Sequence, residues 1–197
     1  MIYVRAVQKK SIKNVVEGSN YSMIIYCSKA LQIALKLNKQ DFATTEQLAK
    51  EDNPFYSWHG HIAKVDGRNT TVLMNDKTMY CMLLRNKLPQ NKDKFAELVM
   101  DALPYTFEVG NINAKEISTY MCNVDNIVFA EKADRQITGN INRMILDMGY
   151  GWEYAWREDE TIQAYEAYEE NRLLRKIGKD YVVPFEEMLK SLSGIHE

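Results

Sequence analysis

Two histidines, His59 and His61, lie two positions apart beside Trp58, in the part of the sequence that most resembles a chemical site. On a β-strand both imidazoles point to one face, about 7 Å apart. Two imidazoles at that separation can share a metal ion, but a site also needs a third ligand. The aspartates that could supply it are Asp66, Asp76 and Asp125. The pattern therefore indicates either a metal site made from His59, His61 and Asp76, or a hairpin edge with a bonded His59 and a solvent-facing His61.

Other kinds of catalytic site have less support. Ser57 is close to His59 in sequence, but no nucleophile elbow surrounds it, and no base is placed beside Cys81. The nine glycines form no dinucleotide-binding or phosphate-binding loop. Asp76 followed by Lys77 resembles a nuclease pair, although a turn with a surface ion pair is the commoner meaning. We therefore expect no cofactor and favour a non-enzymatic protein.

A second candidate region combines aromatic and acidic residues. Trp152 and Trp156 would share one face of a helix, and Glu158, Asp159 and Glu160 follow them directly. Large aromatic side chains dominate binding hot spots, and an acidic surround suits a basic partner. The alternative is an aromatic stripe that packs the C-terminal helices onto the sheet.

Charge is distributed unevenly along the chain, although the formal net charge is −2. The first 50 residues contain eight basic and three acidic residues, whereas residues 151–170 contain seven acidic residues and one arginine. The basic part could meet an anionic partner, and the acidic part could meet a basic one or mimic nucleic acid. We favour the alternative, in which the two parts neutralise each other in the fold or face water.

The elements that position these residues follow from local patterns. The histidines belong to a strand that precedes Asp66-Gly67, a strong hairpin turn signal. Further strands are expected at residues 2–7, 23–27, 70–76 and 125–133, while residues 78–85 suit a strand or a buried helix. Three helices are expected to begin at capping residues, which are Ser28, Thr44 or Thr45, and Asn113. A further helix is expected over residues 91–103, and another begins at Pro184. A long helical signal runs from Thr138 through Ile177, with a break near Gly149 and Gly151.

Composition and order of elements place the chain in the α+β class. With 197 residues, 46% of them hydrophobic and 26% charged, it can bury a sizeable core. We expect a small, mostly antiparallel sheet with a central hairpin, packed by helices concentrated in the C-terminal half. Residues 1–22 would add a strand and a basic linker to a single domain over residues 23–197.

Location is predicted from what the sequence lacks. No apolar run approaches the roughly 18 residues that cross a membrane, and the N-terminus does not resemble a secretory signal. Cys27, Cys81 and Cys122 are widely spaced and suit reduced thiols. We therefore predict a cytoplasmic protein that does not contact membranes.

Several motifs occur in an order that resembles an uncharacterised bacterial family of domains of unknown function. They are MIIYCSKAL, SWHGHIAKVD, TVLMNDKTMYCMLL, TGNINRMILDM and VPFEEMLKSL, spread over Met23 to Leu192. The resemblance implies a compact cytoplasmic α+β domain, met in mobile or plasmid-linked settings, without an established activity. It ties Trp58 and His59 to the family pattern, in which Asn replaces His61. The chain departs from that pattern at Asn140–Arg143, where Arg143 stands at an acidic position, and in the added residues before Met23.

Together these observations predict a binding or regulatory protein that acts through a protein or nucleoprotein partner, as a phage or mobile-element inhibitor of host defence would. The residues expected to bind are Trp58, His59, Trp152, Trp156, Glu158, Asp159 and Glu160. The alternative is a small metal-dependent hydrolase or nuclease centred on His59 and His61. The negative net charge argues against direct binding of duplex nucleic acid, and the sequence is compatible with a homodimer.

Overall fold

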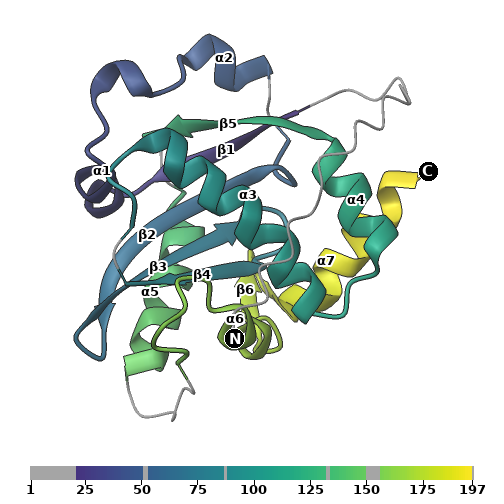
Figure 1. Ribbon diagram of the computed structural model, residues 1–197. Coiled ribbons are helices and arrows are strands. Elements are labelled where there is room, and N and C mark those ends of the chain that lie inside the picture. Colours follow the sequence, from purple (N-terminus) through teal and green to yellow (C-terminus); the bar gives the residue numbers. More distant parts are fainter. Residues whose placement is uncertain (1–20, 51–52, 87, 132–133, 150–155, 197) are drawn as a thin grey trace.

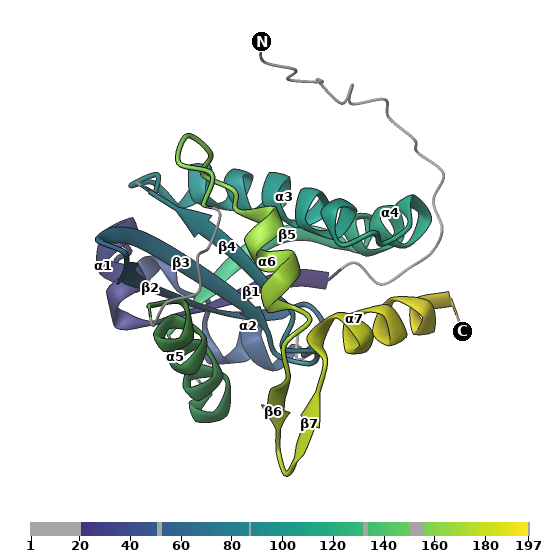
Figure 2. The same ribbon diagram turned by 90° about the horizontal axis from the view of Figure 1, so that it is seen from below.

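The computed structural model describes residues 21–50, 53–86, 88–131, 134–149 and 156–196. Its centre is a five-stranded sheet in the order β4-β3-β2-β1-β5, with helices against both faces (Figures 1 and 2). The strands are β1 (Tyr21–Cys27), β2 (Ser57–Val65), β3 (Arg68–Asn75), β4 (Cys81–Arg85) and β5 (Val124–Ala130). Residues 1–20, which contain the predicted first strand and most of the basic linker, lie outside the described residues. The α+β class is confirmed.

The sheet is mixed, so the prediction of a mostly antiparallel sheet was wrong. β1 pairs in parallel with β2 and β5, whereas β2–β3 and β3–β4 are antiparallel. The parallel pairs arise because helices connect β1 to β2 and β4 to β5, and a helical crossover returns the chain to the same end of the sheet. Tight turns connect the antiparallel strands.

The predicted hairpin is β2–β3, and its turn residues Asp66 and Gly67 both have positive φ, at 49° and 75°. Two positive φ angles match the twist of the flanking strands. Trp58 and Gly60 face the larger core, and His59 and His61 face the opposite side of the sheet, as alternation predicts. A Cβ on Gly60 would lie 2.5 Å from Cδ2 of Leu31, so the helix after β1 can pack closely only because residue 60 is glycine.

The larger core joins one face of the sheet to four helices through side chains such as Leu31, Phe95, Tyr120 and Met188. These helices are α1 (Lys29–Leu35), α3 (Lys92–Val109), α4 (Ala114–Cys122) and α7 (Pro184–Ser193). The connection between β1 and β2 also contains the 3₁₀ turn η1 (Lys39–Asp41) and the short α2 (Thr45–Lys50), and the 3₁₀ turn η2 (Gly194–His196) follows α7. The predicted helix starts are confirmed at Ser28, Thr44 and Asn113, whose side-chain oxygens accept backbone N–H bonds, and at Pro184.

The smaller core covers the opposite face with α5 (Arg135–Gly149), whose Ile137, Ile141, Met144 and Met148 pack on Val72, Met74 and Leu83. The helical signal expected to run to Ile177 ends much earlier, with α6 (Ala164–Glu170). A hairpin of β6 (Arg175–Ile177) and β7 (Asp180–Val182) follows it, turning at Gly178 with φ 61°. The chain leaves the helix because the buried Asn171 bonds to the backbone of Cys81 instead of facing solvent.

The outer edge of β4 is closed by residues from far along the chain. The Asn171 amide donates to the Cys81 carbonyl and accepts the Cys81 N–H, at 3.0 and 2.7 Å. Gln163 N–H donates to the Leu83 carbonyl at 2.9 Å, and Arg85 N–H donates to the Thr161 carbonyl at 2.8 Å. This edge, which would otherwise offer unpaired backbone groups, is therefore occupied within the chain.

Candidate functional site

The buried His59 lies at the centre of a polar cluster between β2 and the start of α5. Its Nδ1 is 2.7 Å from Oδ1 of Asp76, and its Nε2 accepts the backbone N–H of Asp134 at 2.6 Å. The imidazole is stacked on Tyr26, with ring centroids 4.8 Å apart, and only 4% of the residue is exposed. Because Nε2 accepts a hydrogen bond, the proton of the neutral ring is on Nδ1, which donates to the Asp76 carboxylate.

Each partner of His59 is held by its own local structure. Asp76 follows β3 at a turn organised by Asn75, whose Oδ1 accepts from the N–H of Lys77 and of Thr78. Asp134 caps α5, because its Oδ1 accepts the N–H of Gln136 at 2.7 Å and of Ile137 at 3.1 Å. The cluster therefore ties the β2–β3 hairpin to the first turn of α5.

The chemistry open to this cluster is restricted. With Nδ1 and Nε2 of His59 both bonded within the chain, the imidazole has no nitrogen lone pair directed at a substrate or a metal ion. Burial raises the pKa of Asp76, although the hydrogen bond from His59 opposes this effect. This arrangement suits a structural junction better than a general base.

His61 belongs to a separate contact. Its Nδ1 is 2.9 Å from the Ser28 hydroxyl, which also caps α1, and burial lowers the pKa of the imidazole. The sequence-based metal site would need His59, His61 and Asp76 around one point, and the structure brings together only His59 and Asp76. In the described residues, no three His, Cys, Asp or Glu side chains are placed to hold a metal ion.

The two tryptophans predicted as binding residues in the described part of the chain differ in exposure. Trp58 is 0% exposed and donates its indole N–H to the Tyr120 hydroxyl at 3.2 Å, so it is a core residue rather than a surface contact. Trp156 is half-buried beside the smaller core. Trp152 lies outside the described residues.

Trp156 fixes the segment after α5 onto the hairpin. Its indole N–H donates to the Asp66 carboxylate at 3.2 Å, and the Arg85 guanidinium lies 4.0 Å from its ring centroid. Arg85 is almost fully buried, and burial lowers its pKa while Asp66 and Glu158 oppose that shift. The ring therefore lies over the buried guanidinium, within the distance of a cation–π contact.

The predicted acidic residues do not form the helix that the sequence pattern favoured: Glu158 and Asp159 form an exposed turn, and the partly exposed Glu160 follows it. These three residues are here called the acidic turn. Glu158 pairs with Arg68 on β3, and Glu160 pairs with Arg157. Among the described residues Asp159 forms no ion pair. Glu166 and Glu170 are buried, and Glu170 pairs with Arg175, so the acidic count of this region overstates the charge at its surface.

The acidic turn is held by two amide side chains that sequence reasoning missed. The buried Gln163 donates to the carbonyls of Arg157 and Glu160 at 2.8 and 2.6 Å and accepts the N–H of Arg157 at 3.0 Å. Asn86 donates to the carbonyls of Glu158 and Glu160 at 3.3 and 3.5 Å. An isolated Gln or Asn gives little sequence signal for such a role, because the partners are backbone groups.

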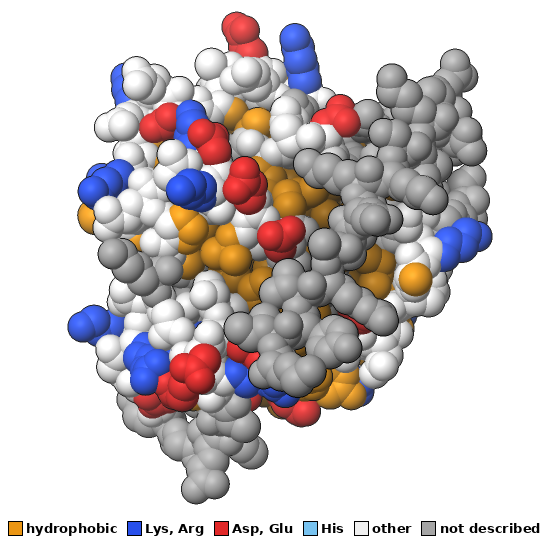
Figure 3. All heavy atoms as spheres, in the orientation of Figure 1, with side chains coloured by type: hydrophobic (Ala, Val, Ile, Leu, Met, Phe, Trp, Pro, Cys, Tyr) orange, Lys and Arg blue, Asp and Glu red, His pale blue; other side chains and the backbone are white. Residues whose placement is uncertain are grey.

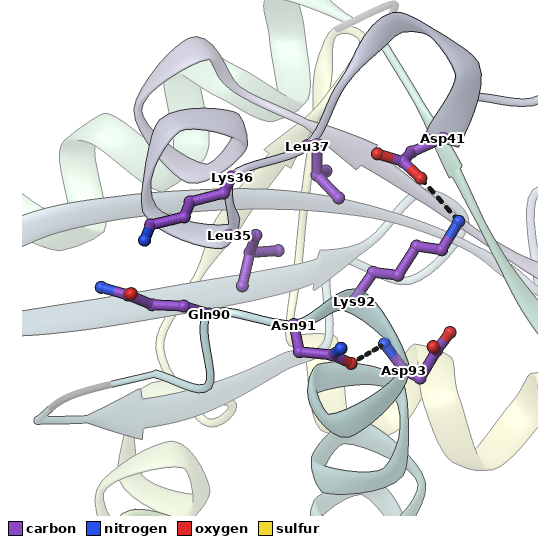
Figure 4. Close-up of a pocket in the computed structure, with 8 residues that line it drawn as sticks. All are labelled: Leu35, Lys36, Leu37, Asp41, Gln90, Asn91, Lys92 and Asp93. Atoms are coloured by element: carbon purple, nitrogen blue, oxygen red, sulfur yellow. Dashed lines mark hydrogen bonds and ion pairs between the residues drawn. The ribbon is translucent and has the colours of Figure 1, made fainter.

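A shallow pocket of about 210 Å³ lies between α1 and the start of α3 (Figure 4). Its lining residues are Leu35, Lys36, Leu37, Asp41, Gln90, Asn91, Lys92 and Asp93. Asp41 and Lys92 form an ion pair of 2.6 Å across it, and Asn91 is occupied in capping α3. The polar groups of the pocket therefore largely satisfy one another.

The face that carries α3 has no uniform charge in its described part. Figure 3 shows hydrophobic side chains near its middle, with basic and acidic side chains scattered around and among them. In the described residues, no helix is both long enough and apolar enough to span a bilayer.

Comparison with known protein families places most of the chain in a family. The family described as "Domain of unknown function (DUF6933)" matches residues 24–187, a range that includes the C-terminal part of β1, the histidine hairpin, the acidic turn and the start of α7. No curated protein and no solved structure matches the chain. The chain therefore belongs to this family of unknown function, as the resemblance in its motifs indicated.

Proposed function

We propose that the protein is a non-enzymatic binding protein whose acidic turn contacts a basic surface on a protein or nucleoprotein partner. The observation that carries this proposal is the anchoring of an exposed, acidic loop by the buried Gln163 side chain. Loops that must be ordered on binding lose affinity, and a loop that is already ordered avoids that loss.

The electrostatics of the turn suit this role. The pairs Arg68–Glu158 and Arg157–Glu160 are both about half exposed, so each contributes little stability and can be exchanged for a partner's basic groups. Asp159 is exposed and forms no ion pair with another described residue, so its carboxylate can contact a basic group of a partner without breaking such a pair. Complementary charge of this kind mainly speeds association and selects the partner.

The alternative function, a metal-dependent hydrolase or nuclease at His59 and His61, would require His59 Nε2 to leave the N–H of Asp134. We place it second for that reason. If Mn²⁺ or Zn²⁺ raised the thermal unfolding temperature and EDTA reversed the effect, with the response lost in His59→Ala, this alternative would replace the binding proposal.

Partner capture from an extract of the native host tests the binding proposal. We expect Asp159→Lys to weaken capture and the triple change of Glu158, Asp159 and Glu160 to Lys to abolish it. Asp125→Lys is the matched control, because Asp125 is an exposed aspartate on β5, the opposite edge strand of the sheet. Equal capture by the triple variant and the native protein would refute the proposal. That the partner is a component of host defence, and that the encounter is cytoplasmic, remain predictions from the sequence.

A further inference from the structure

The β6–β7 hairpin projects from the body of the molecule (Figure 2). Two large apolar side chains on it, Leu174 and Tyr181, are exposed. Lys176 and Tyr181 are cross-strand partners on its outer face, and alternation places Leu174 on the same side. Leu174 is 63% exposed and Tyr181 is 67% exposed. We call this surface, with the flanking Lys179, the basic hairpin.

The basic hairpin is firmly attached, so its exposed residues keep a fixed position. Arg175 pairs with the buried Glu170, and Ile177 packs against the smaller core. The Asn140 amide of α5 donates to the Lys176 carbonyl at 2.9 Å. A fixed hairpin whose outer face holds a leucine and a tyrosine has the character of a docking surface, because folding alone does not bury those two side chains.

The charged residues around Leu174 and Tyr181 indicate which kind of surface could bind the basic hairpin. Arg172, Lys176 and Lys179 are all exposed around the apolar pair, against Asp180. Two hairpins packed face to face would bring Lys176 of one copy against Lys176 of the other, which is unfavourable. Leu174 and Tyr181 lie along the sides of the hairpin, and its tip, Gly178-Lys179, carries a charge and no apolar side chain. This arrangement suits docking on a protein surface better than insertion into a bilayer. The fitting surface is acidic and carries aromatic residues.

The chain itself has such a surface at the acidic turn. Tyr165 is 48% exposed under the Arg157 guanidinium, 4.1 Å from its ring centroid. Tyr105 lies close to both Glu160 and Tyr165: burial is the larger cause of its raised pKa, and these two neighbours add to it. Carboxylates and tyrosines thus occur together here, as leucine, tyrosine and lysines do on the basic hairpin.

We propose that the basic hairpin of one copy docks on the acidic turn of a second copy, so that the chain associates head to tail. This proposal rests on the proposed function of the acidic turn and names a second copy of the chain as a partner. The two surfaces lie at opposite ends of the molecule in Figure 2, so they cannot satisfy each other within one chain. Unlike surfaces of this kind generate rings or open chains rather than isologous dimers.

Sedimentation velocity of the full chain over a range of concentrations tests the proposal. We expect the weight-average sedimentation coefficient to rise with concentration and the rise to vanish in high salt. Two charge-reversed variants, one with Lys176→Glu and Lys179→Glu and the other with Glu158, Asp159 and Glu160 changed to Lys, should each remain monomeric. An equimolar mixture of the two should associate again, because each variant then meets an opposite charge. Asp125→Lys should behave as the native protein does.

Leu174→Ser with Tyr181→Ala tests the apolar part of the contact without changing charge. We expect association at least about tenfold weaker, with unchanged thermal unfolding because both side chains are exposed. A native protein that stays monomeric at every concentration would overturn the proposal, as would a mixture of the charge-reversed variants that stays monomeric. So would binding of the native monomer to vesicles of phosphatidylglycerol through Leu174 and Tyr181. If the native protein is monomeric but captures a host partner through Asp159, the head-to-tail contact fails and the proposed function stands.

Discussion

The His59 cluster and the acidic turn are both polar sites, yet they are built in opposite ways. At His59 the reactive side chains, the buried imidazole and the partly buried Asp76 carboxylate, bond to each other, and the imidazole also bonds to the start of α5. At the acidic turn the buried amide of Gln163 bonds only to backbone groups of the loop, and the charged side chains remain exposed. At the first site, residue types that suggest catalysis stabilise the fold. At the second site, a glutamine without a sequence motif holds an exposed acidic loop in one conformation. Four predictions test this contrast.

The largest effect is expected for His59→Ala. This change leaves the N–H of Asp134 and the partly buried Asp76 carboxylate without their partner and opens a cavity beside Tyr26. We expect a loss of about 3 kcal/mol in the free energy of unfolding, measured with urea. His61→Ala, which loses one contact with Ser28, should cost about 1 kcal/mol. Equal stability of the two variants would show that His59 does not join the β2–β3 hairpin to α5.

Gln163→Glu should have the next largest effect. A carboxylate at this position faces the carbonyls of Arg157 and Glu160, both of which now receive N–H bonds from the amide. We expect a loss of about 2 kcal/mol, together with weaker partner capture, even though the exposed acidic residues are intact. Gln136→Glu is the matched control, because Gln136 is an exposed glutamine that donates to Lys176. Full partner capture by Gln163→Glu would show that the order of the turn does not matter.

A smaller effect is expected at Trp156, where two changes separate its two contacts. Trp156→Phe keeps an aromatic ring over Arg85 but loses the hydrogen bond to Asp66, and Trp156→Leu loses both. We expect losses of about 1 and about 2 kcal/mol in unfolding free energy, because each contact is partly exposed. Identical losses would mean that the ring contributes through buried area alone.

The smallest effect depends on pH and concerns His61. Burial lowers the pKa of His61 in the folded chain below its ordinary 6.5. Below pH 6.5 the unfolded chain binds a proton that the folded chain resists, so stability is complete above 6.5 and decreases as the pH falls towards the lowered pKa. His61→Asn removes this titration. The stability difference between native protein and variant should therefore shift against the native protein on acidification, and a constant difference would contradict the assignment.

Sequence patterns predicted the local features of the fold and missed those that depend on distant residues. Asp66-Gly67, Asn113 and Pro184 carry strong local preferences, and each lies where the pattern indicated. The mixed sheet was missed because parallel pairing depends on the path of the crossovers, which alternation does not encode. The helix predicted to run to Ile177 ended at Glu170 because the contact of Asn171 with Cys81 overrode helical propensity.

The candidate site followed the same division. That His59 and His61 share one face of a strand was predictable from their spacing alone. That His59 would bond to the backbone of Asp134, 75 residues away in sequence, was not predictable. The exposure of Glu158 and Asp159 was compatible with their charge, but the burial of Glu166 and Glu170 required the position of Arg175 and the packing of α6.

The closed edge of β4 has a consequence for how the chain is made. Asn171, which completes the backbone bonds of Cys81, is 90 residues further along the chain. During synthesis, β4 therefore leaves the ribosome well before the residues that cover its edge, and an uncovered strand edge is prone to pair with other chains. We expect nascent or truncated chains that end before α6 to aggregate or to need a chaperone. Synthesis of α6 and Asn171, which cover the edge of β4, should remove this tendency.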